Sequence, residues 1–174
     1  MTQQRPEPQV SVIVPAYQEG DAILPVLTRF AAAIHTPFEC LVVVDTPDDS
    51  TVAAVEKFAA DDSRFYSVIN TYGRGPSNAI RFGIDFARSS CVVVTMADGS
   101  DDPRQIDRLA ELVDRGVVVA SASRYMPGGQ QVGGPLVKST LSRAAGLSLR
   151  SFARVGTTDA TNSFKAYSTE FVRS

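Results

Sequence analysis

The strongest constraint on the fold is a regular alternation of short apolar runs with amphipathic segments. The runs span residues 10–14, 41–44, 65–69, 92–95 and 117–120, and nearly all of their residues are apolar. Strands buried on both faces of a parallel sheet have this composition, whereas a strand with one solvated face alternates apolar and polar residues. The alternation therefore predicts an α/β domain with a mostly parallel central sheet and helices on both faces.

The segments between these runs have the periodicity of helices. Apolar residues recur at positions i, i+3, i+4 and i+7, which places them on one face of a helix. The three sets are Ile106, Leu109, Ala110 and Val113; Ala79, Phe82, Gly83 and Phe86; and, more loosely, Val52, Val55, Phe58 and Ala59. Crossovers of this kind bring the carboxyl ends of the strands to one edge of the sheet, where ligands usually bind.

Length, charge and cysteine content indicate which kind of α/β protein this is. The 174 residues suit one domain, and we expect a flexible polar lead over residues 1–9 before a domain over 10–174. A formal net charge of -2 argues against a nucleic-acid partner. No apolar stretch reaches the roughly 18 residues of a membrane span, so none is expected in this chain. Cys40 and Cys91 border apolar runs and are expected to be buried thiols of a cytoplasmic protein.

The segment MADGSDDP follows the fourth apolar run with three aspartates. Asp102 precedes a proline, as expected for the N-cap of a helix with Pro103 at its first position. Asp101 is expected to be an alternative cap or simply solvated. Asp98 comes too early to cap this helix, so it is either held by turn amides or contacts a metal or ligand.

Two further strand ends each leave one acidic residue without a capping role. The pair 49–50 supplies a cap after the second run, which leaves Asp45. Asp21 is expected to cap the helix after the first run, which leaves Glu19. A nucleotide bound through its base and ribose hydroxyls, together with a divalent ion, would use Glu19, Asp45 and Asp98.

Several common motifs are absent from the sequence. Residues 73–75 only hint at G-x-G-x-x-G and follow the third run, so a dinucleotide fingerprint is not supported. The glycine-rich segment 127–138 is not a P-loop, because glycine or proline follows its second glycine, where the P-loop motif requires lysine. With His35 as the single histidine and no G-x-S-x-G, a serine hydrolase is not expected. A zinc site is not expected, because the sequence has no cluster of histidine and cysteine.

Seven segments in fixed order resemble one known family. They read VSVIVPAYQEG, VVVDTPDDST, GRGPSNAIRFGIDFA, VVVTMADGSDDP, ASRYMPGG, LVKSTLSRAAGL and DATNSFKAY. Together they resemble the family 2 glycosyltransferases, whose catalytic domain has the Rossmann-like GT-A fold. Within that family they are most similar to the dolichyl- and polyprenyl-phosphate mannosyl- or glucosyltransferases, and the likeness covers about residues 10–167.

The resemblance implies an inverting transfer of a hexose from a nucleotide-diphosphate sugar to a polyprenyl phosphate at a membrane surface. It also implies a divalent metal, Mg²⁺ or Mn²⁺. Asp98 matches the last aspartate of the family's D-x-D metal motif, and Ser100 stands at a further metal position. The residues that match nucleotide-binding positions are Pro15, Tyr17, Glu19, Asp45, Arg74 and Ala97.

The resemblance also assigns basic residues to the reacting centre. Arg124 and Arg143 match arginines that hold phosphates there, and Lys138 matches a position near the acceptor or phosphate. The glycine-rich loop from about 126 to 135 is expected to be mobile until substrates bind and then to exclude water. The implied location is the cytoplasmic face of a membrane, with peripheral attachment.

The sequence departs from the family pattern at several positions. Met96 replaces the first aspartate of D-x-D, Ser100 replaces a frequent glutamine, and residues 162–165 replace S-G-F-R. Relatives usually continue beyond position 174, so the catalytic domain is expected to be truncated at its carboxyl end. Two alternatives stay open: transfer to a saccharide or protein hydroxyl, with Asp159 as the base, and a non-catalytic nucleotide-binding module.

Overall fold

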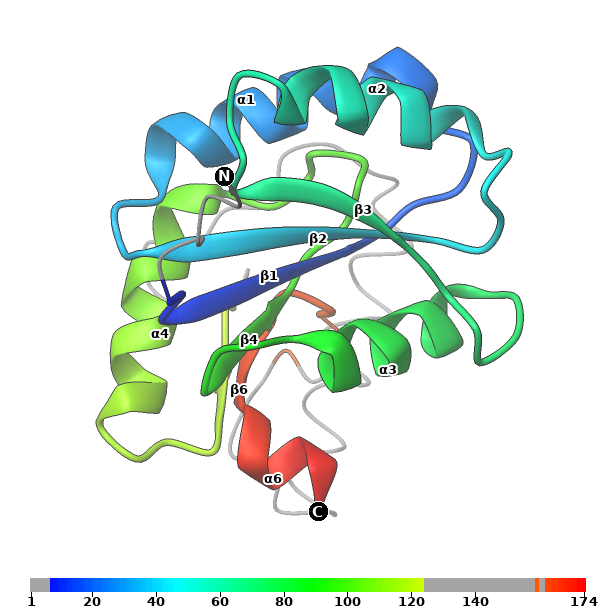
Figure 1. Ribbon diagram of the computed structural model, residues 1–174. Helices are drawn as coiled ribbons and strands as arrows, with labels where there is room; N and C mark the ends of the chain where they lie inside the picture. Colours follow the sequence, from blue (N-terminus) through cyan, green and yellow to red (C-terminus); the bar gives the residue numbers. More distant parts are fainter. Residues whose placement is uncertain (1–6, 124–158, 160–161) are drawn as a thin grey trace, which may run out of the picture.

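The computed structural model describes residues 7–123, 159 and 162–174, which contain one six-stranded sheet with the strand order β3-β2-β1-β4-β6-β5 (Figure 1). The strands are β1 (Val10–Pro15), β2 (Phe38–Val44), β3 (Phe65–Ile69), β4 (Cys91–Val94), β5 (Val119–Ser121) and β6 (Lys165–Ser168). The α-helices are α1 (Leu24–Ala33), α2 (Ser50–Ala59), α3 (Pro76–Phe86), α4 (Ile106–Asp114) and α6 (Thr169–Arg173). Two short 3₁₀ helices, η1 (Gly20–Ile23) and η2 (Pro103–Gln105), precede α1 and α4.

The sheet is mostly parallel, as the apolar runs predicted. β1 pairs in parallel with β2 and β4, and β2 pairs in parallel with β3. β6 lies antiparallel between β4 and β5, so β5 runs in the same direction as β4 but does not pair with it. The carboxyl ends of five strands and the amino end of β6 therefore share one edge of the sheet.

Two apolar cores cover the two faces of the sheet, which confirms the predicted layers. Val12 and Val14 of β1 pack into one core together with apolar residues of α1, α2 and α4. Ile13 points the other way and packs into a second core with Ala79 of α3. In Figure 1, α1 and α2 lie on one side of the sheet and α3 lies on the other.

Helix α3 lies very close to the sheet because a glycine faces it. A Cβ atom placed on Gly83 would lie 2.6 Å from Cγ2 of Ile13 and 3.1 Å from Cγ2 of Val43. The first separation is shorter than any normal carbon–carbon contact and the second is unusually short, so a larger residue would push the helix away from β1 and β2. Gly83 belongs to the helix face that the sequence predicted, and its small size sets the helix–sheet distance.

Two of the predicted caps are confirmed and one is wrong. The carboxylate of Asp102 accepts a hydrogen bond from Arg104 N at 3.1 Å, and that of Asp49 accepts one from Thr51 N at 2.8 Å. Asp21 does not cap the first helix, because η1 runs directly into α1. The amide of Leu24 donates to the carbonyl oxygen of Asp21, so backbone groups already satisfy the start of α1.

The fifth strand begins two residues later than the apolar run predicted. Gly116, with φ of +95°, ends α4, and its amide donates to Val113 O at 2.9 Å. Val117 N donates to Leu112 O at 3.0 Å, so the amide of Val117 is bound to the last turn of α4 and is not available to the sheet. The strand starts only at Val119.

Both cysteines, Cys40 and Cys91, are buried free thiols, as predicted. Burial raises the pKa of each thiol, that of Cys91 to about 12, so neither is a reactive thiolate at neutral pH. Within the described part of the chain, no helix is both long and apolar enough to cross a membrane.

Candidate functional site

The loops that follow β1, β2 and β3 gather on one side of the molecule (Figure 1). β1 lies between β2 and β4 in the sheet, so the segment after β1 is flanked by the segments after those two strands. These segments contain Glu19, Asp45 and Asp98, respectively. The fold thus brings the three acidic residues that have no predicted capping role to the same edge of the sheet.

The first loop is held by the start of helix α2. Pro15 is buried at the end of β1, and Gln18, with φ of +55°, donates its amide to both carboxylate oxygens of Asp49 at 3.2 and 3.0 Å. Glu19 N donates to Thr51 Oγ1 at 3.0 Å. Tyr17, between these anchors, is 73% exposed and available for stacking on a ligand.

Asp49 therefore has a second role that the capping pattern did not predict. Its side chain is only 3% exposed, and burial raises its pKa. Hydrogen bonds from Thr51 and Gln18 outweigh burial and hold the pKa below its usual value, so this carboxylate stays charged at neutral pH. One buried charge thus fixes both the start of α2 and the first loop.

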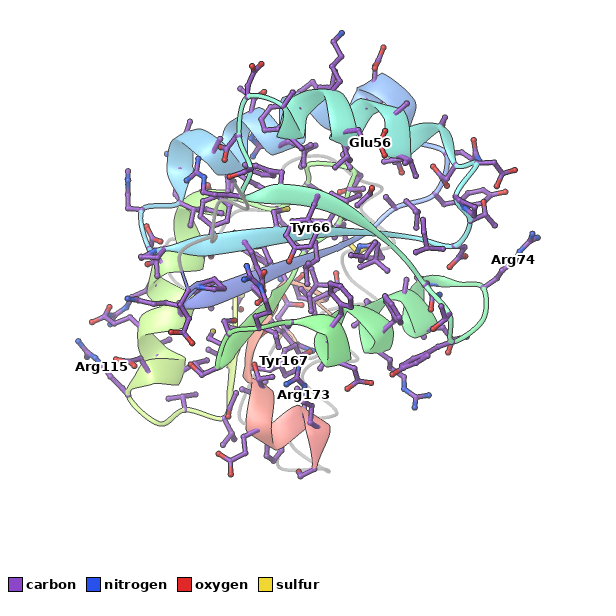
Figure 2. All side chains as sticks on the ribbon, viewed as in Figure 1. Glu56, Tyr66, Arg74, Arg115, Tyr167 and Arg173 are labelled. Atoms are coloured by element: carbon purple, nitrogen blue, oxygen red, sulfur yellow. The ribbon has the colours of Figure 1, made fainter. Side chains whose placement is uncertain are left out.

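Asp45 links the end of β2 to the loop before α3. Its Oδ1 accepts a hydrogen bond from Asn70 Nδ2, and its Oδ2 accepts one from Gly75 N, both at 2.9 Å. Gly75, with φ of +111°, adopts a backbone conformation that side chains disfavour. Arg74 is exposed in the same loop and extends away from the rest of the molecule (Figure 2). Asp45 is therefore both a structural link and a candidate ligand contact.

Sequence reasoning missed Asn70, which organises this loop. Its side chain is 6% exposed and donates to Gly73 O at 2.6 Å as well as to Asp45. Its Oδ1 accepts a hydrogen bond from Tyr72 N at 2.8 Å. An asparagine directly after an expected strand is a signal for such a turn, and three bonds from one amide hold the loop against Asp45.

The segment after β4 presents Asp98 and Ser100 to solvent. Both are exposed, and Asp98 Oδ1 accepts a hydrogen bond from Ser100 N at 2.9 Å. Ala97, just before them, is 6% exposed and anchors the turn in the core. Asp98 is thus held by a turn amide, which was one of the two alternatives predicted for it. Its carboxylate is also exposed to solvent, where a ligand could bind.

The prediction for Asp101 is wrong, because its carboxylate turns back toward the strand. Its Oδ2 accepts hydrogen bonds from Thr95 Oγ1 at 2.7 Å and from Met96 N at 3.2 Å. Asp101 is therefore neither a cap nor merely solvated, and it joins the end of the 98–101 turn to the end of β4. The sequence could not show this bond, because it depends on how the turn folds back.

The donor atoms at this turn fit a hard divalent cation only together with a nucleotide. No cluster of three or more histidine, cysteine, aspartate or glutamate side chains that could hold a metal occurs among the described residues. Asp98 and Ser100 offer oxygen ligands, which suit Mg²⁺ or Mn²⁺. Magnesium commonly binds through one or two carboxylates plus substrate phosphates and water, so a single carboxylate suits a cation that is also bound by a diphosphate and water.

The segment before β6 lies at the same edge of the sheet, next to the carboxyl ends of β4 and β5. Asn162 Nδ2 donates to Ala122 O at 2.8 Å, and Phe164 is buried at 2% exposure. Asp159, the candidate base of the alternative reaction, is only 1% exposed. Arg124, Lys138, Arg143 and the loop 126–135 lie outside the described residues, so their predicted roles stay predictions.

The mixed sheet and its loop edge define a glycosyltransferase fold of the GT-A type. A mannosyltransferase of Pyrobaculum calidifontis, solved in complex with GDP-Man and Mn²⁺, superposes with a TM-score of 0.63 over 96% of this chain and 46% of that chain, at 24% identity. The chain belongs to glycosyl transferase family 2, whose family model matches residues 11–174. The family resemblance of the seven segments is thereby confirmed.

Two curated relatives are similar over nearly the whole chain. A polyprenol monophosphomannose synthase of Mycolicibacterium smegmatis is 34% identical over 170 residues, which are 95% of this chain and 64% of that protein. An undecaprenyl-phosphate mannosyltransferase of Micrococcus luteus is 32% identical over 170 residues, which are 95% of this chain and 68% of that protein. The chain thus spans about two thirds of the length of these relatives.

Proposed function

We propose that this protein transfers a hexose from a nucleotide-diphosphate sugar to a polyprenyl phosphate with inversion at the anomeric carbon. The observation that carries the proposal is the exposed Asp98–Ser100 turn at the end of β4, on the same edge as Asp45 and Glu19. The polyprenyl-phosphate mannosyltransferases among its relatives support the acceptor class. Such an acceptor would bring the protein to the cytoplasmic face of a membrane.

The chemistry follows from the charges on the two substrates. A phosphate oxygen of the acceptor forms the new bond to the anomeric carbon while the bond from that carbon to the nucleotide diphosphate breaks. That phosphate oxygen is already anionic near neutral pH, so no strong general base is required. A bound divalent cation supplies Lewis-acid neutralisation of the departing diphosphate. Asp98 and Ser100 would hold this cation.

The remaining residues have separate proposed roles. Tyr17, Glu19 and Asp45 would bind the base and ribose, and Pro15, Arg74 and Ala97 belong to the same proposed set of nucleotide-binding residues. Arg124 and Arg143 would balance the phosphate charges, because a guanidinium forms paired hydrogen bonds with phosphate oxygens. Lys138 would add a positive charge near the acceptor. We expect Arg143→Ala to weaken binding of the lipid phosphate acceptor more than binding of the nucleotide-sugar donor.

The two alternative functions, transfer to a hydroxyl group and nucleotide binding without catalysis, have less support. Transfer to a neutral hydroxyl needs a base, and Asp159 is buried at 1% exposure. A binding module without activity is favoured only by Met96, which removes one carboxylate from the metal motif.

A transfer assay tests the proposal directly. Purified protein is incubated with GDP-, UDP- or dTDP-linked hexoses and Mn²⁺, with either a polyprenyl phosphate or a neutral saccharide as acceptor. We expect metal-dependent transfer to the lipid phosphate with one of these donors. Transfer only to the neutral saccharide would favour the hydroxyl alternative, and nucleotide binding without any transfer would favour the binding module.

A further inference from the structure

A side chain from helix α1 holds the turn that carries Asp98. Arg29 donates from Nη1 to Gly99 O at 2.7 Å and from Nη2 to Asp101 O at 3.1 Å. These two carbonyl groups flank Ser100 on either side. Arg29 lies about seventy residues away in the sequence and belongs to none of the segments that carry the family resemblance.

The same turn is held from its other side by its own residues. The Asp101 carboxylate binds back to Thr95 and Met96, and Asp98 binds Ser100 N. A Cβ atom on Gly99 would lie 3.2 Å from both Arg29 Nη1 and Val26 Cγ2, so the turn packs directly on α1. The turn is therefore fixed between the end of β4 and the surface of a helix.

Helix α1 is a rigid support for this contact. Val26, Leu27 and Phe30 are at most 6% exposed and pack into the main core. Arg29 is on the exposed part of the same helix, one residue from Phe30. Its guanidinium is planar and presents two N–H groups in a fixed fork, which suits two carbonyl oxygens held apart by one residue.

We propose that Arg29 is a positioning residue that keeps Asp98 and Ser100 in the conformation that binds the divalent cation. This role rests on the proposed function. Both hydrogen bonds of Arg29 to the turn end on backbone oxygens, so the side chain orders the turn without occupying either oxygen of the Asp98 carboxylate.

The sign of the effect separates positioning from simple electrostatics. A positive charge close to a cation site repels the cation, so loss of charge alone would strengthen cation binding. Loss of positioning would weaken it, because partners that orient metal ligands typically contribute 10–100-fold to metal affinity. Weaker binding after removal of a positive side chain therefore identifies the positioning role.

The test measures Mn²⁺ affinity by electron paramagnetic resonance in the presence of GDP or UDP. Arg29→Ala should weaken Mn²⁺ binding by roughly tenfold. Arg29→Lys should recover only part of the loss, because one ammonium group cannot replace a two-pronged contact. The matched control is Arg104→Ala, which removes an exposed arginine paired with Asp102 and should not weaken Mn²⁺ binding.

Hydrogen–deuterium exchange gives a readout that does not need metal. Arg29→Ala should speed amide exchange at residues 98–101, including Ser100 N, and leave the core strands unchanged. Unchanged exchange, or faster exchange with unchanged or tighter Mn²⁺ binding, would overturn the inference. If the unsubstituted protein bound no Mn²⁺ with either nucleotide, the proposed function would fail, together with the metal role of Arg29. The exchange data would then still decide whether Arg29 holds the turn.

Discussion

At the scale of single residues, neighbouring aspartates in MADGSDDP have different roles. Asp98 is the proposed metal ligand, Asp101 ties the turn to the end of β4, and Asp102 caps η2. Asp98→Asn should weaken nucleotide-dependent Mn²⁺ binding by at least about tenfold, since loss of an outer partner alone commonly has that effect. Isothermal titration calorimetry with Mn²⁺ and nucleotide measures the change.

Asp102→Asn is the matched control for this prediction. Asparagine caps helices about as well as aspartate, and the lost ion pair with Arg104 is largely exposed and contributes little. We therefore expect unchanged Mn²⁺ affinity and nearly unchanged stability. Equal losses in both variants would mean that net negative charge, and not the position of Asp98, determines cation binding.

Asn70 gives a second prediction at this scale. Asn70→Ala removes three hydrogen bonds of a buried amide and leaves Asp45 and Tyr72 N each without one partner. We expect a loss of about 1–3 kcal/mol in the free energy of unfolding. We also expect weaker nucleotide binding, because Asp45 and the 70–75 loop lose their fixed positions.

Urea unfolding and nucleotide titration measure these two effects separately. Asn78→Ala is the control, because the side-chain hydrogen bond from Asn78 to the same loop is long, 3.3 Å to Arg74 O. Nucleotide affinity that stays unchanged in Asn70→Ala, despite lower stability, would show that Asp45 needs no support from Asn70.

At the scale of elements, the close packing of helix α3 predicts that a glycine-to-alanine substitution lowers stability, which is the reverse of the usual effect in a helix. Replacing glycine with alanine inside a helix normally stabilises it by up to about 1 kcal/mol. At Gly83 the new methyl group would lie 2.6 Å from Ile13 Cγ2, so Gly83→Ala should instead destabilise by about 1–3 kcal/mol. Thermal unfolding measures the change, and exposed Ser77→Ala on the same helix is the control. A stabilised Gly83→Ala variant would show that α3 can move away from the sheet without cost.

The sequence predicted the elements whose pattern is local. Buried strands and one-sided helices each leave a periodicity in a short window, so β1 to β4 and the faces of α2, α3 and α4 were predictable. β6 was missed because Lys165–Ser168 is short and mixes polar with apolar residues. Its place between β4 and β5 depends on pairing with strands far away in the sequence, which no local pattern encodes.

The candidate site was predictable to the same extent. Strand ends and caps identified Glu19, Asp45, Asp98 and the capping role of Asp49, because these depend on position along the chain. The roles of Arg29, Asn70 and Asp101 depend on how one loop folds against another element. Such side-chain contacts become visible only when the loops have defined positions.

At the scale of the whole molecule, a buried charge lies near the sheet edge opposite the candidate site. Glu39 on β2 is 1% exposed and accepts hydrogen bonds from Ser11 Oγ at 2.6 Å, Tyr66 OH at 2.5 Å and Arg88 Nε at 2.7 Å. Tyr66 lies over the middle of the sheet in Figure 2. These bonds join β1, β2, β3 and the segment before β4 near the amino ends of the strands.

This network makes the stability of the molecule depend on pH in a defined direction. Burial raises the pKa of Glu39, but the hydrogen bonds from Ser11, Tyr66 and Arg88 outweigh burial and hold the pKa below its ordinary value of 4.5. A carboxyl group with a lowered pKa in the folded state stabilises that state fully above its unfolded pKa. The contribution is lost as the pH falls below about 4.5 toward the folded pKa.

Glu39→Gln should therefore flatten the acid side of the stability profile. The free energy of unfolding of the unsubstituted protein should fall as the pH drops below about 4.5, and Glu39 alone contributes at most about 1.4 kcal/mol per pH unit. The variant should be less stable at pH 7 and should lose less on acidification, as measured by urea unfolding between pH 3 and 7. Glu111→Gln, which removes an exposed carboxylate that pairs with Arg108 and Arg115, is the control and should keep most of the acid dependence. An acid dependence that is identical in Glu39→Gln and the unsubstituted protein would show that other carboxylates, such as Asp49 and Asp107, account for it.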